Sequence, residues 1–238
     1  TTVAIATARK FAATGQRVLL TSQDPGPSLE TLLGMPVGVD PVPLGDRLQV
    51  VQFQTATLLE RSWEEVKKIE AQYLKTPFFK AVYGQELGVL PGMDEALALN
   101  ALREADASGD YDVIVYDGDG GQSTLRMFGM PEILSWYLRR FRNVFLESDL
   151  GKTLKPFAQP VASAVLNVDW SGDLFAQPTN QADNMLDQGK TAVANPRRVA
   201  AYLITTSQPE AIATARYLWG AAQQIALTVG GVLLNREV

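Results

Sequence analysis

Residues 112–121 read DVIVYDGDGG, an apolar run that begins and ends with an acid and leads into a glycine-rich stretch. An apolar run without polar alternation is typical of a strand buried on both faces of a parallel sheet. Similar runs are separated by segments with helical spacing, and they span residues 17–22, 48–53, 199–205 and 229–234. Strands that alternate with helices in this way predict an α/β fold with a doubly wound, mostly parallel sheet that helices cover on both faces.

The segments between these runs predict helices over residues 2–14, 28–33, 55–83, 94–107, 130–144 and 209–227. The fifth of these helices has Pro131 near its start, and proline is typical of a first helical turn. No linker clearly divides the chain, so we expect a single domain. Residues 55–92 and 130–195 are expected to form a helical subdomain beside the sheet.

The composition excludes several classes of site. The 238 residues include no cysteine and no histidine, which excludes disulfides, Cys/His zinc sites, catalytic thiols and a Ser-His-Asp triad. A formal net charge of −5 is unfavourable for binding a long run of nucleic-acid phosphates. The longest uncharged run, residues 217–235, contains two glutamines, a threonine and three glycines, so no membrane span is expected. No secretory signal is recognisable, and a cytoplasmic location is expected.

Acids stand at the ends of two predicted strands. Asp24 follows the strand over residues 17–22, and Asp117 ends the strand over residues 112–117. Ligands of open α/β sheets bind at the carboxyl ends of the strands, where an aspartate can hold Mg²⁺ or a water molecule. The alternative is structural, because aspartates in such positions also cap helices and make turns.

Five short motifs follow one another along the chain. They are SQDP at residues 22–25, PGMDEA at 91–96, DGDGGQSTLR at 117–126, TTSQPE at 205–210 and GVLLNR at 231–236. In these motifs the sequence resembles the arsenite-pump ATPases and the ATPases that target tail-anchored membrane proteins. The corresponding family motifs read S-T-D-P, P-G-x-D/E-E-A, D-T-A-P-T-G-H-T-L-R, P-E and V-V-N-R. The resemblance covers nearly the whole chain and implies a P-loop NTPase fold of the ArsA-like, MinD/ParA-related class.

The resemblance also implies ATP and Mg²⁺ as cofactors and assigns roles to particular residues. The family's first strand and its phosphate loop, GKGGVGKT, are expected before Thr1. Thr1 would then give its hydroxyl to Mg²⁺, and Thr2 would contact the α-phosphate from a helix N-terminus. Asp24, in switch I, would orient or activate the attacking water, and Asp117 would hold Mg²⁺ through water. Asn235 would contact the adenine through its amide, which both donates and accepts.

Switch II is expected to include Asp117, Asp119, Gly120, Gly121, Thr124 and Arg126. It departs from the family pattern, because Gly118, Asp119, Gly120 and Gln122 stand where the family has Thr, Ala, Pro and Gly. An added carboxylate at Asp119 would repel ATP unless a cation screens it. The alternative to an ATP hydrolase is therefore a degenerate relative that binds a partner protein without hydrolysing nucleotide.

The resemblance implies a nucleotide-gated homodimer that handles a hydrophobic protein client, such as a tail-anchored membrane protein. The chain has no cysteine and therefore no CxxC zinc clasp. One branch of the family likewise lacks this clasp. The predicted groove for the client consists of Met127, Met130, Leu134 and Trp136, because flexible Met-rich surfaces suit varied clients. The same apolar cluster also fits the protein core.

Overall fold

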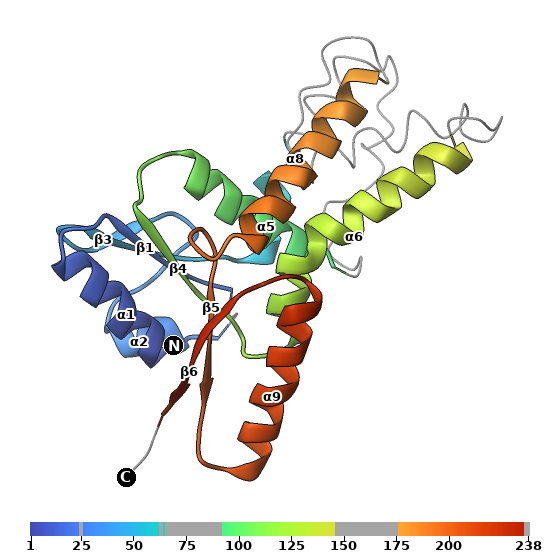
Figure 1. Ribbon diagram of the computed structural model, residues 1–238. Coiled ribbons are helices and arrows are strands. Elements are labelled where there is room, and N and C mark those ends of the chain that lie inside the picture. Colours follow the sequence, from blue (N-terminus) through green and yellow to red (C-terminus); the bar gives the residue numbers. More distant parts are fainter. Residues whose placement is uncertain (24–25, 62–63, 65–91, 146–175, 236–238) are drawn as a thin grey trace.

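The computed structural model describes residues 1–23, 26–61, 64, 92–145 and 176–235 (Figure 1). Its main sheet has four strands in the order β2-β3-β1-β4. They are β1 (Val18–Ser22), β2 (Val42–Gly45), β3 (Leu48–Gln52) and β4 (Val113–Asp117). Strand β1 is parallel to both β3 and β4, whereas β2 is an antiparallel edge strand. The predicted α/β fold with a mostly parallel sheet is confirmed.

Helices cover both faces of the main sheet, which explains why its strands are apolar without alternation. On one face, α1 (Thr2–Ala13) and α2 (Ser28–Leu33) pack against Val18 and Leu20 of β1. On the other face, Leu19 packs with residues of α5 (Met93–Ala107) and α6 (Gln122–Phe145). Successive side chains of β1 therefore lie in two different hydrophobic clusters, one on each face of the sheet. Both faces of the strand thus require apolar side chains.

The two remaining strands form a separate sheet beside β4 (Figure 1). Strand β5 (Ala201–Thr205) pairs in parallel with β6 (Val229–Leu234), and α9 (Pro209–Gln224) connects them. Within the described part of the chain, β4 and β5 are not hydrogen-bonded to each other. The single sheet expected from the sequence is therefore divided between β4 and β5.

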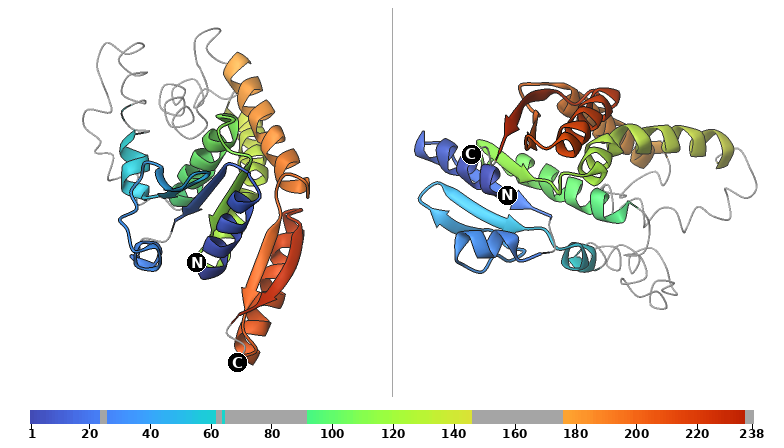
Figure 2. Two further views of the ribbon diagram at one scale, coloured as in Figure 1. Left: turned by 90° about the vertical axis from the view of Figure 1, so that its left-hand side faces the viewer. Right: turned by 90° about the horizontal axis from the view of Figure 1, so that it is seen from below.

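Two helices extend beyond the sheets, namely α6 and α8 (Ala176–Ala194) (Figures 1 and 2). They are packed closely, since a Cβ on Gly189 of α8 would lie 3.1 Å from Cγ of Pro131 on α6. The predicted helical subdomain also includes residues 65–91 and 146–175, which lie outside the described residues. No helix of the described ranges is long and apolar enough to span a membrane.

Most predicted helices begin and end within two or three residues of those observed, but α6 is a clear correction. The helix expected over residues 130–144 begins at Gln122, and Pro131 lies inside it instead of in its first turn. Asp119 holds the turn before this start, because its side chain accepts hydrogen bonds from the backbone N–H of Gly121, just before the helix, and from the hydroxyl of Ser123 in its first turn. The long helix expected over residues 55–83 is seen over 55–61, and residues 65–83 are not described.

Candidate functional site

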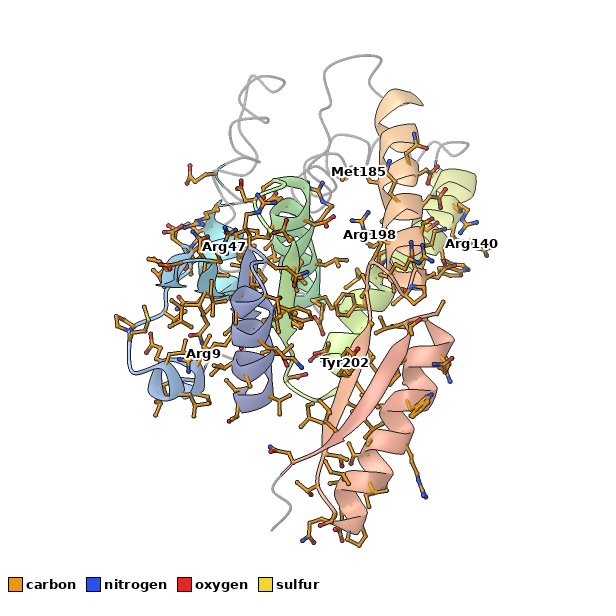
Figure 3. The ribbon with its side chains drawn as sticks, turned by 60° about the vertical axis from the view of Figure 1, so that its left-hand side comes forward. Arg9, Arg47, Arg140, Met185, Arg198 and Tyr202 are labelled. Carbon is orange, nitrogen blue, oxygen red and sulfur yellow. The ribbon has the colours of Figure 1, made fainter. Side chains whose placement is uncertain are left out.

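A cavity of about 1870 Å³ lies between β4 and β5, at the division between the two sheets. It is bordered by α1, α6, α8 and α9, and Tyr202 of β5 forms part of its wall (Figure 3). Residues from widely separated motifs meet along this cavity: Thr1, Thr2, Asp117, Asp119, Gly120, Gly121, Thr124 and Asn235. The fold thus brings together most of the residues that the sequence predicts to bind nucleotide and Mg²⁺.

Thr1 and Asp117 are in direct contact. Asp117 ends β4, and its Oδ1 lies 3.2 Å from the main-chain nitrogen of Thr1, which precedes α1. The side chain of Asp117 is only 12% exposed. The amino end of α1 and the carboxyl end of β4 therefore lie close together at the cavity.

The turn after β4 depends on its glycines. A Cβ on Gly118 would lie 2.5 Å from the Oγ1 of Thr124, a distance that no side chain tolerates without rearrangement. Gly120 has φ +73°, in the left-handed region that glycine adopts most readily. The glycines allow the chain to turn sharply from β4 into α6, so that the first turn of α6 lies beside Asp117.

Asp119 is bound by the start of α6. Its Oδ1 accepts hydrogen bonds from the backbone N–H of Gly121 at 2.9 Å and from the hydroxyl of Thr124 at 3.1 Å. Its Oδ2 accepts a hydrogen bond from the hydroxyl of Ser123. Partial burial alone would raise the pKa of Asp119, but these hydrogen bonds outweigh it and hold the pKa below its usual value. These hydrogen bonds keep Asp119 negatively charged, so the expectation that its carboxylate repels ATP unless a cation screens it stays a prediction.

Arg126 points to a different neighbour from the other switch II residues. Its Nε lies 3.3 Å from Oε1 of Glu95 in the first turn of α5, and the Glu95 side chain is 12% exposed. Arg126 does not line the cavity between β4 and β5. The ion pair instead joins two of the family-like motifs, at residues 91–96 and 117–126.

Asp24 lies outside the described residues, but both of its flanks are held. The Nε2 of Gln52 donates to the carbonyl oxygen of Gly26 at 3.1 Å. On the other flank, Gln23 hydrogen-bonds through its side chain to Tyr116 and to Asp94. Reasoning from the sequence missed Gln23 and Tyr116. The available signal was Gln23 itself, which stands where the S-T-D-P motif has threonine.

Asn235 follows β6 directly. Its main-chain N–H donates to the carbonyl oxygen of Thr205 at 2.8 Å, which extends the pairing of β5 and β6 by one residue. Its side chain is half-buried and borders the cavity. Asn235 and β4 thus line the same cavity, which lies between the two sheets. The contact of Asn235 with an adenine remains a prediction.

The predicted client groove does not form one surface. Met127 is fully buried in the cluster with Leu19 and Ala98, so it belongs to the core and is withdrawn as a client contact. Met130 and Leu134 are half-buried and border the cavity. Trp136 is 58% exposed and packs edge-to-face on Tyr137 with a centroid distance of 5.0 Å. One face of α6 therefore packs in the core, and the opposite face is exposed to solvent.

The residues present fit a magnesium–nucleotide site. Mg²⁺ bound with ATP takes one or two protein oxygen ligands, and water and phosphate oxygens complete its octahedron. The hydroxyl of Thr1 and the carboxylate of Asp117 are donors of this kind. Among the described residues, no group of three or more acids could hold a metal ion. A magnesium–nucleotide site does not require such a group.

Comparison with known proteins places these features in a family. The family model described as "Anion-transporting ATPase" matches residues 1–238. A protein of Prosthecochloris vibrioformis that is assigned by name as an arsenical pump-driving ATPase is 27% identical over 201 residues, which are 81% of this chain and 49% of that protein. A protein of the same assigned name from Chlorobaculum tepidum is 28% identical and is matched over 68% of this chain and 40% of its own length. The ATPase GET3 of Malassezia globosa is 26% identical, with 68% of this chain and 46% of that protein covered.

The chain thus spans about half the length, or less, of the curated relatives it matches. The family model nevertheless covers every residue of it, and residues from four of the five motifs line one cavity in the fold. The chain belongs to the anion-transporting ATPase family, the ArsA-type ATPases.

Proposed function

We propose that this chain forms the catalytic core of a Mg²⁺-dependent ATPase that works as a nucleotide-gated homodimer on a hydrophobic protein client in the cytoplasm. The observation that carries the proposal is that Thr1, just before α1, and Asp117, at the end of β4, line the same cavity as Gly120 and Gly121 of the turn into α6. Catalysis of phosphoryl transfer consists mainly of positioning and of electrostatic stabilisation, and this arrangement can supply both.

Each residue has a defined task in this proposal. Thr1 binds Mg²⁺ directly, and Asp117 holds one of its water ligands. Thr2 donates to the α-phosphate from the start of α1, where free backbone N–H groups favour an anion. Asp24 orients the attacking water, and Asn235 contacts the base. The bound Mg²⁺ supplies neutralisation of the negative charge on the phosphates.

The division between β4 and β5 supports a further part of the proposal. Strand β4 carries the sequence of a fully buried strand, yet all five of its residues are only half-buried. Among the described strands, β4 and β5 each have an edge without a hydrogen-bonded neighbour, and both strands line the same cavity. We infer that the family's first strand occupies this space and leads the phosphate loop to Thr1, so that the two sheets become one.

The exposed face of α6 is the part of the described structure that best fits a hydrophobic client. Ile133, Trp136 and Tyr137 are spaced at i, i+3 and i+4, so they share one side of the helix, and all three are exposed. The side of α6 that carries Met127 packs against the core instead. A client helix could lay its apolar face along this stripe when ATP closes the dimer.

The metal site can be tested by titrating a fluorescent ATP analogue into the full-length protein with and without Mg²⁺. Asp117→Asn should abolish the Mg²⁺-dependent part of the binding because it weakens the hold on the metal's water. Asp112→Asn is a matched control, since Asp112 lies just before the other end of β4 and is paired with Arg17. If Asp117→Asn binds the analogue as the wild type does, with the same dependence on Mg²⁺, the assignment of Asp117 is wrong.

A further inference from the structure

Gln23 holds an unusual position for a polar side chain, between the end of β1 and the predicted catalytic residue Asp24. Its Nε2 donates to the main-chain carbonyl oxygen of Asp94 at 2.9 Å. Its Oε1 accepts a hydrogen bond from the phenol of Tyr116, also at 2.9 Å. We call these two hydrogen bonds the Gln23 bridge.

The two partners fix the orientation of the Gln23 amide. A carbonyl oxygen can only accept, so the amide must present its NH₂ group to Asp94. The oxygen of the amide then faces Tyr116 and accepts a hydrogen bond from its phenol. Tyr116 is held in turn by an edge-to-face contact with Phe128 of α6, at a centroid distance of 6.2 Å. The bridge is therefore specific in direction as well as in distance.

The bridge connects the two switch segments. Tyr116 is the residue before Asp117 in β4, so one hydrogen bond leads from the switch I loop to the metal site. Asp94 lies in the first turn of α5, and the next residue, Glu95, pairs with Arg126 of α6. A second path thus leads from the same glutamine, through the first turn of α5, to the end of switch II.

We propose that Gln23 is a positioning residue, which couples the placement of Asp24 to the state of Asp117 and switch II through Tyr116 and the first turn of α5. This inference rests on the proposed ATPase function. A movement of β4 or of α6 on nucleotide binding reaches Asp24 through the bridge, because Gln23 is its neighbour in the chain. Loss of the bridge is expected to leave nucleotide binding intact and to lower turnover, because Gln23 directly precedes the predicted catalytic residue Asp24 in the chain.

The test is a steady-state ATPase assay on the full-length protein with Gln23→Met and Tyr116→Phe. Each variant keeps the approximate shape of the side chain: Gln23→Met removes both hydrogen bonds of the bridge, and Tyr116→Phe removes the one between Tyr116 and Gln23. Each should lower kcat about tenfold, the effect of one lost hydrogen bond, while KM for ATP changes less than about twofold. In the double variant the two effects should not add in full, because both substitutions break the hydrogen bond between Tyr116 and Gln23.

The matched control is Tyr111→Phe. The phenol of Tyr111 donates to Oε1 of Gln49 at 2.6 Å, so this variant also removes a Tyr–Gln hydrogen bond, near the opposite end of β4. It should shift the unfolding midpoint about as much as Tyr116→Phe does and leave kcat unchanged. Circular dichroism and denaturation of all variants separate folding defects from catalytic ones.

The outcomes distinguish this inference from the proposed function. If the wild type hydrolyses ATP and both bridge variants keep its kcat, the bridge is only structural and the inference is overturned. If kcat falls equally in Tyr111→Phe, the effect is one of general stability, and the inference is again overturned. A wild type that binds ATP but never hydrolyses it would instead contradict the proposed function, and with it any role in positioning Asp24.

Discussion

Asp112 and Asp117, one just before β4 and the other at its end, have different partners. Oδ1 of Asp112 lies 2.7 Å from Nη2 of Arg17, and its Oδ2 accepts from the main-chain N–H of Arg17 at 2.8 Å. Asp117 instead faces Thr1 at the cavity. The sequence identifies both acids as the limits of an apolar strand, but only the fold shows which one is held by an arginine and which one faces the predicted metal site.

The Asp112 pair predicts a dependence of stability on pH. Hydrogen bonds from the Arg17 side chain and main chain lower the pKa of Asp112 from 3.8 to about 2. Because the folded pKa is the lower one, the stabilisation is complete above about pH 4 and is lost as the pH falls toward 2. The melting temperature of Asp112→Asn should therefore fall less steeply than that of the wild type between pH 4 and pH 2.5. Equal slopes in calorimetry would show that the pair contributes nothing.

Gly118 makes a second prediction at the residue scale. In Gly118→Ala the new methyl group meets the Thr124 side chain, so the turn into α6 must shift. We expect a loss of about 1–3 kcal/mol in the free energy of unfolding, measured with urea. Gly38→Ala is the control, because a Cβ at Gly38 meets nothing within 4 Å. An equal loss in both variants would count against the close approach of Gly118 and Thr124.

At the scale of elements, α6 shows both the reach and the limit of sequence patterns. The apolar cluster around residues 127–138 indicates a helix. Pro131 lies inside that helix, but in sequence a proline is typical of a first helical turn, so it predicts a later start. The helix begins eight residues earlier, directly after the turn that Asp119 holds, and no spacing rule connects that acid to a helix beyond Pro131. Strand β2 was missed for a related reason. It contains Pro43 and Gly45, which a sheet tolerates at an antiparallel edge but which indicate a loop when met in sequence.

The two faces of α6 give a prediction that separates core from surface. Met127→Ala should lower the free energy of unfolding by about 2–5 kcal/mol, because it leaves a cavity beside Leu19 and Ala98. Trp136→Ala, on the exposed face, should change it by less than about 0.5 kcal/mol. If that face binds a client, Trp136→Ala should also weaken pull-down of a model peptide with one apolar transmembrane segment. A large loss of stability in Trp136→Ala would place that residue in the core instead.

At the scale of the whole molecule, the sequence predicts which segments are strands but not how they pair. An apolar run reports burial on both faces, and it carries no information about its neighbours in the sheet. The division between β4 and β5 was therefore not predictable from the described strands themselves. The candidate site was predictable only through the motifs, because Thr1, Asp117 and Asn235 come from three distant parts of the chain that the fold brings to one cavity.

We propose that this cavity belongs to an ATP-hydrolysing site in which Asp24 orients water and Thr1 and Asp117 hold Mg²⁺. The measurement that tests it most directly is phosphate release from ATP by the full-length wild type and by Asp24→Asn, alongside nucleotide binding by both proteins. We predict hydrolysis that requires Mg²⁺ in the wild type, and in Asp24→Asn unchanged binding with a kcat lowered at least about hundredfold. Wild-type turnover in Asp24→Asn, or a wild type that binds no nucleotide, would contradict it.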